Sequence, residues 1–428
     1  MKDTGKQITG RILNSNLAYH LIKPTVNSLY LNPLRKPTNE GAMKSVSGVE
    51  SLAGVLIKDP KLKVLESGVL ATLKENFRKA IETGKDTNLT IKVKRTLDLM
   101  SSQVLSSLAV DFGVMGCGIK RLKQKPSEPA IEEFAIQTRS DCNMNPRCRD
   151  CFAEDDTGKL DYKTQRRVIK EALSLGSRFN IILGGEPLLD KNNLFKLFHE
   201  FRKMPFIVAT NGILLDEAYA KEVALLGNVI TLINIPGLED TTNRIRQNSE
   251  RWNRVQKAAE NLKKYGAASG FASTVYSDTF MELSSPEFVQ QMIDFNMLIG
   301  FYFGCDNPFG CNKPTRHRMT QQMNDFFSQR AKDIADRLPI FLVDTTNGAE
   351  EKIKGCPGGN GNLLLIRSNG NAGSCPMDSQ KDNELNVYTM SLKEILKSEY
   401  FELLRKRRPH CAKTPKFIRE LESLNLIP

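Results

Sequence analysis

Three cysteines stand close together in the stretch SDCNMNPRCRDCF, as Cys142, Cys148 and Cys151. Thiolates gathered in one loop bind a soft metal, which in proteins is zinc or the iron of an iron–sulfur cluster. A fourth thiolate would complete the coordination of a structural site, whereas three leave a position open for a substrate or a cofactor. Two plainer interpretations stand beside this one: a zinc knuckle with a distant fourth ligand, and a set of reduced structural cysteines.

A second motif, IILGGEPLLD, follows the cysteine loop and contains Gly184, Gly185, Glu186 and Pro187. Glycine has no side chain, so a glycine pair lets the backbone approach a ligand closely. The carboxylate of Glu186 follows at once. A Gly-Gly turn after a strand is common by itself, but together with the cysteine loop it indicates a cofactor site.

The segments around these motifs alternate between predicted strands and predicted helices from about residue 134 to residue 335. Such alternation with short connections predicts a parallel α/β sheet with right-handed crossovers, either open or closed into a barrel. The predicted strands cover residues 132–138, 179–185, 205–212, 229–237, 270–278 and 301–304, and the helices between them cover residues 162–176, 192–203, 216–227, 251–266 and 285–300.

The carboxyl ends of parallel strands meet at one edge of a sheet, where α/β enzymes place their chemistry. The cysteine loop and GGEP follow the first two predicted strands. Asn211 in TNG, Asn234 in NIPG, and the GCDNPFGC stretch with Cys305 and Cys311 follow later strands. We therefore expect these residues to converge.

In its cysteine loop and its GGEP motif the chain resembles the radical S-adenosylmethionine (radical SAM) enzymes. The resemblance implies a partial (β/α)6 barrel in which Cys142, Cys148 and Cys151 ligate a [4Fe–4S] cluster. SAM then binds the cluster through its amino and carboxylate groups, and GGEP contacts its amino group and methionyl part. Reductive cleavage of SAM gives a 5′-deoxyadenosyl radical that abstracts hydrogen from the substrate, chemistry that no side chain offers.

The same resemblance places Asn211 and Asn234 where the family makes polar contacts to SAM. Asparagine also suits turns, so a turn role is the alternative for each. The chain departs from the common Cys-x3-Cys-x2-Cys spacing, because the first gap has five residues and includes Pro146. Asp150 stands before the third cysteine, where the family often has an aromatic residue, and Phe152 follows it.

The remaining cysteines form a second group. Cys356 and Cys375 fit Cys-x13-Gly-x4-Cys, with Gly370 in the Asn-Gly turn of a predicted β-hairpin. The pattern resembles the start of the SPASM and twitch extensions of radical SAM enzymes, which carry auxiliary [4Fe–4S] clusters. It implies one auxiliary cluster, with ligands drawn from five candidates; the alternative is structural cysteines without metal. The candidates are Cys305, Cys311, Cys356, Cys375 and Cys411.

Three regions are expected: a helical N-terminal region at 1–130, the radical SAM core at 131–335 and a cysteine-rich extension at 336–428. Helical spacing predicts helices over residues 63–84 and 90–113, for which packing on a neighbouring domain is favoured and contact with a membrane surface is left open. Cys117 is expected to be a buried structural thiol. No secretory signal or membrane-spanning run is found, so a cytoplasmic location is expected.

The formal net charge is +12, but the basic residues are spread along the chain and aromatic residues make up only 7%. A nucleic-acid surface is therefore not expected. Glu239, Asp240 and Arg244 are expected to be ordinary helix charges rather than part of a site. His20, His199 and His317 stand apart and are expected to be structural or surface residues.

The substrate is left open by the sequence, as a peptide or protein, a small molecule or a lipid. The expected outcome is oxidation or bond formation, and an electron donor such as flavodoxin or ferredoxin is implied by the resemblance. Two readings from other classes are kept as alternatives. An RNA-modifying radical SAM enzyme would bind RNA with strong salt dependence, and a zinc-stabilised binding protein would not bind SAM.

Overall fold

The computed structural model describes residues 43, 60–99, 131, 133–146, 148, 151, 158–177, 179–304, 318–346, 358–359, 361–375, 385–407 and 415–424. These residues belong to two compact units. One consists of Met1–Lys125 with Lys203–Pro205, and the other of Pro126–Arg202 with Phe206–Pro428.

A nine-stranded sheet, in the order β7-β6-β5-β4-β3-β2-β1-β8-β9, forms the centre of the larger unit. Strands β1 to β7 pair in parallel in chain order, and β8 pairs in parallel with the other side of β1. The described strands leave β7 and β9 as separate edges, so the barrel is not closed. The strands are β1 (Glu133–Gln137), β2 (Asn180–Leu183), β3 (Phe206–Thr210), β4 (Val229–Asn234), β5 (Ser269–Val275), β6 (Ile299–Gly304), β7 (Phe341–Asp344), β8 (Leu363–Ile366) and β9 (Ala372–Gly373).

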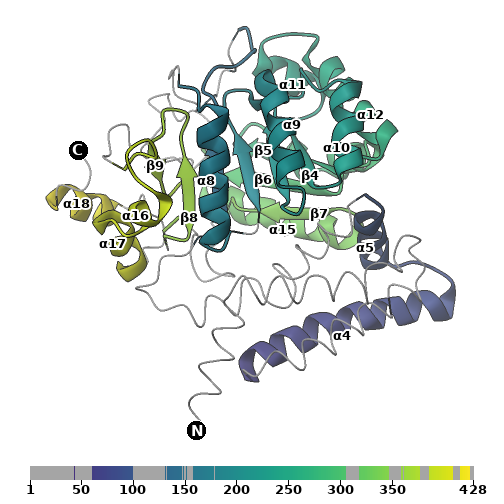
Figure 1. Ribbon diagram of the computed structural model, residues 1–428. Coiled ribbons are helices and arrows are strands. Elements are labelled where there is room, and N and C mark those ends of the chain that lie inside the picture. The colour runs from purple at the N-terminus through teal and green to yellow at the C-terminus, as the bar shows by residue number, and fades with distance from the viewer. Residues whose placement is uncertain are drawn as a thin grey trace. The chain divides into compact units, whose positions relative to one another are not determined.

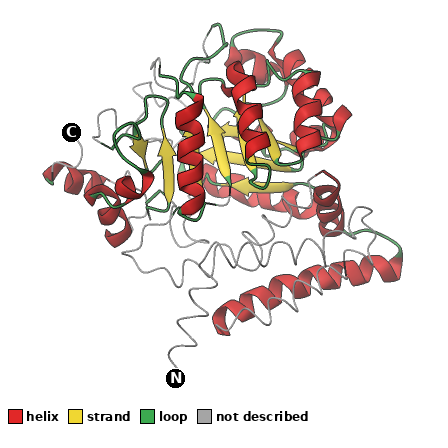
Figure 2. Cartoon of the chain, viewed as in Figure 1, coloured by secondary structure: helices red, strands yellow, loops and turns green. Residues whose placement is uncertain are grey.

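Helices connect the parallel strands, as the alternation predicts, and Figure 2 shows them along one side of the sheet. Asp161, Asp216, Ser285 and Thr320 each begin a helix by accepting a backbone N–H with the side chain. The helical segments are α8 (Tyr162–Ser174), η4 (Pro187–Asp190), α9 (Lys191–Glu200), α10 (Glu217–Leu226), α11 (Glu239–Arg246), α12 (Arg251–Tyr265), α13 (Phe280–Leu283), α14 (Pro286–Asp294) and α15 (Gln321–Arg337).

The predicted strands and helices are confirmed, with one shift between the last helix and the last strand. The helix predicted over 285–300 ends at Asp294, because Asn296 adopts a positive φ of 62° that a helix does not accommodate. Strand β6 therefore begins at Ile299, inside the range predicted as helix.

The core lies between the sheet and these helices. Phe206 of β3 packs on Phe198 of α9, with ring centroids 4.9 Å apart. Tyr302 of β6 packs edge-to-face on Phe327 of α15 at 5.0 Å. All four side chains are completely buried. Alternate residues of these strands thus face the helices.

The C-terminal hairpin predicted from Asn369-Gly370 is confirmed, since β8 and β9 pair antiparallel. Gly370 has a φ of +89°, and an added Cβ would lie 2.6 Å from the ring of Tyr388, so only glycine suits this turn. The described chain then continues through α16 (Leu392–Leu396), α17 (Glu399–Arg407) and α18 (Pro415–Ser423), which Figure 1 shows beside β8 and β9.

The smaller unit is described by α4 (Pro60–Thr83) and α5 (Asn88–Leu99), which pack together. The first predicted helix is confirmed and stops before Gly84, whose φ is +66°. The second is described only as far as Leu99. None of the helices in the described parts of the chain is long and apolar enough to cross a membrane. The domain limits at residues 130 and 335 stay predictions.

Gly300 of β6 makes room for the ring of Phe271 on β5. A Cβ at Gly300 would lie 2.1 Å from Phe271 Cζ, and that ring also packs on Phe288 and Tyr302. We predict that Gly300→Ala lowers the free energy of unfolding by about 1–3 kcal/mol through overpacking. Chemical denaturation of Gly300→Ala, Phe271→Leu and the double variant tests this. The loss in the double variant should be smaller than the sum of the two single losses, and strict additivity would contradict the proposed clash.

Candidate cofactor site

The cysteine loop leaves the sheet at the carboxyl end of β1. Backbone hydrogen bonds hold its two ends together, with Ser140 N donating to Gly158 O (3.1 Å) and Leu160 N donating to Thr138 O (3.0 Å). Cys142 is exposed, whereas Cys148 and Cys151 are half-buried, and Cys151 N donates to Cys148 O (3.2 Å). The three predicted ligands therefore lie in one loop that begins and ends at the same edge of the sheet.

The glycine pair of GGEP packs against the backbone at the start of this loop. Gly185 N donates to Arg139 O (2.8 Å), and Glu186 N donates to Asp141 O (2.9 Å). A Cβ on Gly185 would lie 2.3 Å from the carbonyl oxygens of both Ser140 and Asp141. In the structure the glycine is thus required by the approach of two backbone segments. The close approach to a ligand that the sequence predicts for this glycine pair stays a prediction.

Arg139 and Asp141 form an ion pair within the same stretch, through two hydrogen bonds from the guanidinium to the carboxylate. Hydrogen bonding by Arg139 holds the pKa of Asp141 below its usual range. The side chains on either side of Ser140 are thereby tied to each other, which restricts the backbone that Gly185 contacts.

Glu186 is completely buried and joins the end of β2 to the end of β3. Its carboxylate accepts hydrogen bonds from Leu188 N (3.0 Å), Thr210 Oγ1 (2.7 Å) and Asn211 N (2.8 Å). Burial raises the pKa of Glu186, and the three donors partly oppose that effect. The carboxylate therefore links the end of β2 to the end of β3 through hydrogen bonds.

Asn211 makes a turn contact and also faces the cysteine loop, while its predicted contact with SAM stays a prediction. Its Oδ1 accepts a hydrogen bond from Ile213 N (3.0 Å), which is a turn contact. Its Nδ2 donates to Asn143 Oδ1 (2.8 Å) and lies 3.6 Å from Cys142 Sγ. The side chain of the β3 turn is thus directed at the first cysteine.

Asn234, at the end of β4, is connected to the cysteine loop through Arg246 at the end of α11. The Arg246 guanidinium donates to Asn234 through Nη2 and to Cys148 Sγ through Nη1. Asn234 Nδ2 also donates to Ala272 O of β5 (3.2 Å). A second arginine, Arg251 at the start of α12, donates to Asn145 O (3.2 Å).

Sequence reasoning missed Arg246 and Arg251 and considered Arg244 instead. Arg244, Glu239 and Asp240 are exposed, and Arg244 pairs with Asp278 (3.0 Å), so the interpretation as ordinary helix charges agrees with their positions. All of these residues lie in or beside one short charged helix. Nothing in the sequence separates the arginine that faces the loop from the one that faces solvent.

The donor set suits an iron–sulfur cluster. No three His, Cys, Asp or Glu side chains among the described residues meet closely enough to hold a single metal ion. A cluster spreads its thiolates over several irons, so it does not need that convergence. Desolvation raises the pKa of the Cys142 thiol, an effect that coordination overcomes because metal-bound thiols are deprotonated.

Of the remaining residues considered in the sequence, Cys375 and His199 lie in the described part of the chain. Cys375 follows β9 and is half-buried. His199 lies exposed on α9 beside Glu222, consistent with a surface role. The other predicted positions lie outside the described residues: Cys117, Cys305, Cys311, Cys356, Cys411, His20, His317, Asp150 and Phe152.

Comparison with protein families gives a match of residues 137–279 to the model of the Radical SAM superfamily. This range starts at the end of β1 and ends beyond β5, so it contains the cysteine loop, GGEP, Asn211 and Asn234. Among curated proteins, Fe-coproporphyrin III synthase of Methanosarcina barkeri is 22% identical over 139 residues, which are 31% of this chain. The chain spans 34% of that relative's length.

Among solved structures, anSMEcpe with bound AdoMet and the Cp18Cys peptide has a TM-score of 0.54 at 18% identity, covering 69% of this chain and 87% of that one. SuiB of Streptococcus suis bound to S-adenosylmethionine also has a TM-score of 0.54, at 14% identity, covering 81% and 82%. At these identities the similarity is one of fold.

The contact at Gly185 generates a first prediction about the site. We predict that Gly185→Ala lowers the iron and sulfide content of anaerobically reconstituted protein, because the added methyl group displaces the start of the cysteine loop. Gly266→Ala is the control, since Gly266 has nothing within 4 Å of an added Cβ and its positive φ (+66°) makes the added methyl group costly without a clash. The control should cost about 1 kcal/mol of stability and keep its iron. Equal iron in both variants would rule out this role of Gly185.

The buried carboxylate generates a second prediction. Glu186→Gln should lower the free energy of unfolding by about 1–3 kcal/mol, because an amide N–H₂ group replaces one acceptor oxygen and leaves a buried donor unpaired. Folding raises the pKa of Glu186, so its contribution to stability falls as pH rises above the unfolded value of 4.5. The difference in unfolding free energy between wild type and Glu186→Gln should therefore be largest at low pH. Denaturation of both proteins between about pH 4 and pH 8 measures it, and a difference that grows with pH would contradict the assignment.

Proposed function

The chain contains a radical SAM domain and so belongs to the radical SAM superfamily of enzymes, and on this premise we propose that the whole protein removes a hydrogen atom from a C–H bond of its substrate. The superfamily uses a [4Fe–4S] cluster and SAM, which together supply a carbon radical that no side chain provides. The observation that carries the proposal is the attachment of the cysteine loop to GGEP through Gly185 and Glu186.

Cys142, Cys148 and Cys151 are proposed as the cluster ligands, since all three leave β1 in a single loop at the edge where the other polar strand ends meet. Asn211 and Asn234 are proposed to contact SAM. Their support is their distance from the thiols: Asn211 Nδ2 lies 3.6 Å from Cys142 Sγ, and Asn234 is linked to Cys148 through Arg246.

The GGEP residues Gly184, Gly185, Glu186 and Pro187 are proposed to present their backbone to SAM. The carboxylate of Glu186 already accepts hydrogen bonds from three protein donors. The role that fits it is positioning, because it fixes the end of β2 relative to Asn211. Pro187 begins the 3-10 helix η4 and turns the chain away from the loop.

One auxiliary [4Fe–4S] cluster is proposed for the C-terminal extension. Cys375 supports it by its position directly after the predicted hairpin, half-buried rather than within the core. Its partners are proposed among Cys305, Cys311, Cys356 and Cys411. A flavodoxin or ferredoxin is proposed as electron donor, and a cytoplasmic location is proposed with it. The product is proposed to arise by oxidation or bond formation.

The deciding experiment compares wild type with the Cys142→Ala/Cys148→Ala/Cys151→Ala variant after anaerobic reconstitution. We expect about eight irons and 5′-deoxyadenosine formation from SAM in wild type, and about four irons and no 5′-deoxyadenosine in the variant. About four irons in wild type and none in the variant would keep the enzyme and remove the auxiliary cluster. Zinc instead of iron, with SAM intact, would overturn the proposal.

Arg246 offers a sharper test of the site, with Arg244 as the matched control on the same helix. Arg246→Ala should lower 5′-deoxyadenosine formation about tenfold or more, because one charge-assisted contact contributes about 1.5–3 kcal/mol. Arg244→Ala should leave it within about twofold, since that side chain makes only an exposed ion pair. Rates measured at saturating SAM, with SAM affinity measured separately, decide the matter. Equal losses in the two variants would show that the Arg246 contacts do not matter.

A further inference from the structure

The end of the cysteine loop, at Gly158, holds the beginning of the same loop. The carbonyl oxygen of Gly158 accepts hydrogen bonds from both Ser140 N and Ser140 Oγ, each at 3.1 Å. Ser140 is only 4% exposed, so these bonds are shielded from water. The backbone of Ser140 and Asp141 is also the one that Gly185 contacts. The beginning of the loop is therefore held both by GGEP and by the loop's own end.

Gly158 in turn packs on the β8–β9 hairpin of the C-terminal extension. A Cβ at Gly158 would lie 2.8 Å from Asn369 N, 2.8 Å from the carbonyl carbon of Ser368 and 2.9 Å from Ser368 Oγ. The first two atoms belong to the backbone, so rotation of a side chain would not relieve the contact. The turn of the hairpin is therefore packed directly against the end of the cysteine loop, although the two are far apart in sequence.

The strand pairing explains how the turn and the loop come together. Strand β8 pairs in parallel with β1, and Ile366 lies opposite Ile136. Because the two strands run in the same direction, the Asn369-Gly370 turn leaves the sheet at the edge where the cysteine loop does. Strand β2, which carries GGEP, lies on the other side of β1. The cysteine loop thus has GGEP on one side and the hairpin turn on the other.

The turn is itself held by the segment that follows the hairpin. Asn386 Nδ2 donates to Asn369 O (3.3 Å) and to Asn371 Oδ1 (2.8 Å). Val387 N donates to Gly370 O (2.9 Å). The position of the turn is therefore set by several hydrogen bonds and not only by the pairing of β8 with β1.

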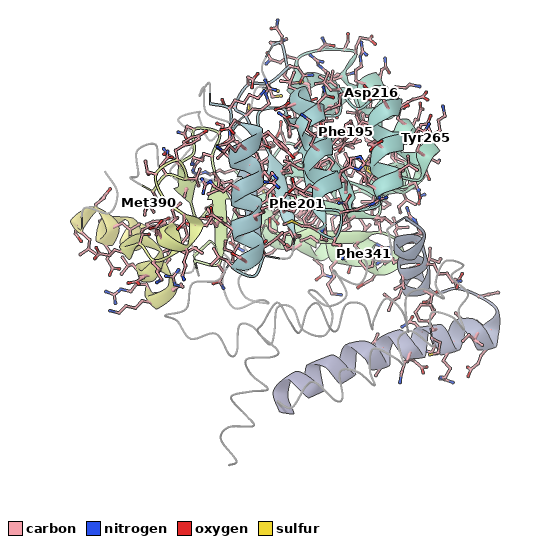
Figure 3. The ribbon with its side chains drawn as sticks, viewed as in Figure 1. Phe195, Phe201, Asp216, Tyr265, Phe341 and Met390 are labelled. Atoms are coloured by element: carbon pink, nitrogen blue, oxygen red, sulfur yellow. The ribbon has the colours of Figure 1, made fainter. Side chains whose placement is uncertain are left out.

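This following segment is anchored on α8, the first helix after the cysteine loop. Arg167 donates to Val387 O, and Glu171 accepts a hydrogen bond from Leu392 N (2.7 Å). Arg167 and Glu171 also form an ion pair with each other. Met390, which Figure 3 labels, stands between Val387 and Leu392 in the chain. The hairpin turn is thus fixed both to β1 and to α8, the two elements that flank the cysteine loop.

We propose that the Asn369-Gly370 turn positions the cysteine loop for cluster binding, and that Gly158 is the residue through which it acts. The C-terminal extension is then part of the SAM-cluster site as well as the carrier of an auxiliary cluster. The inference rests on the proposed function, because it concerns the loop that is proposed to hold the first cluster. It requires that a change confined to the turn alters the behaviour of Cys148 and Cys151.

Site-resolved alkylation of the full chain before reconstitution tests the positioning without turnover. Cys148 and Cys151 are half-buried, so their rates of reaction with iodoacetamide report how firmly the loop is held. Mass spectrometry of the digested protein gives the rate for each thiol. Circular dichroism checks that every variant folds.

The variants strain opposite ends of the same strand. Gly370→Ala strains the turn, since Gly370 has a φ of +89° and the ring of Tyr388 lies 2.6 Å from the added Cβ. Gly361→Ala is the control in the same extension. Gly361 also has a positive φ (+68°), and an added Cβ would lie 3.1 Å from Arg405 Cγ, but this glycine precedes β8 and packs on α17.

We expect Gly370→Ala and Gly158→Ala to raise the alkylation rates of Cys148 and Cys151 about fivefold or more. Gly361→Ala should leave both rates within about 1.5-fold of wild type, because its strain falls on α17. Equal rates in Gly370→Ala and Gly361→Ala would overturn the inference, since the extension would then act on the loop only through its general stability.

Asn386→Ala keeps the test valid if the added methyl group at Gly370 prevents folding. It removes two hydrogen bonds to the turn and adds no atoms. The alkylation rates of Cys148 and Cys151 should rise about threefold or more. Wild-type rates in Asn386→Ala would contradict the proposed role of the turn.

A spectroscopic measurement on the reconstituted protein separates this inference from the proposed function. SAM bound at the open iron alters the EPR spectrum of the reduced cluster, so the fraction of the signal that changes with SAM reports a correctly held first cluster. This fraction should fall about threefold or more in Gly370→Ala and stay unchanged in Gly361→Ala. A wild-type protein without any SAM-dependent signal would overturn the proposed function, whatever the alkylation rates. A SAM-dependent signal in wild type, with equal alkylation in all variants, would overturn the positioning role alone.

Discussion

The contact between Gly185 and the backbone of Ser140 and Asp141 is the constraint on which the site depends. It brings the end of β2 against the beginning of the cysteine loop at a distance that no side chain larger than hydrogen permits. Glu186 continues the same connection to β3 through Thr210 and Asn211. Three neighbouring strand ends are thereby fixed relative to one another by hydrogen bonds that are shielded from water, where each is stronger and more costly to break.

Two arginines hold the later part of the cysteine loop. Arg246 reaches Cys148 and Asn234 from α11, and Arg251 reaches Asn145 from α12. Guanidinium groups suit this task because each presents several donors in a rigid plane. The positive charge also lies where a cluster ligated by thiolates would be electron-rich. The loop is thus attached by backbone contacts at its first residues and by arginines further along.

The two faces of the sheet differ in how far their side chains are buried. The outer face packs against helices with completely buried aromatic pairs such as Phe198–Phe206 and Tyr302–Phe327, and this packing stabilises the fold. The opposite face of β6 and β7 is apolar too, but Phe303, Phe341 and Val343 on it keep more than a third of their surface exposed.

The sequence by itself determined the strand and helix alternation, the three-cysteine loop, the GGEP motif and the Asn-Gly hairpin. These are local features: periodicity, capping residues and glycines with positive φ act within a few residues, so a single chain segment reveals them. Only the tertiary structure decided that Gly185 packs against the backbone of Ser140 and Asp141. It also decided that the buried carboxylate of Glu186 links β2 to β3. It placed Arg246 rather than Arg244 against Cys148. Those contacts join residues that are distant in sequence. Which side chain faces the loop therefore depends on how β1, β2 and α11 pack against one another.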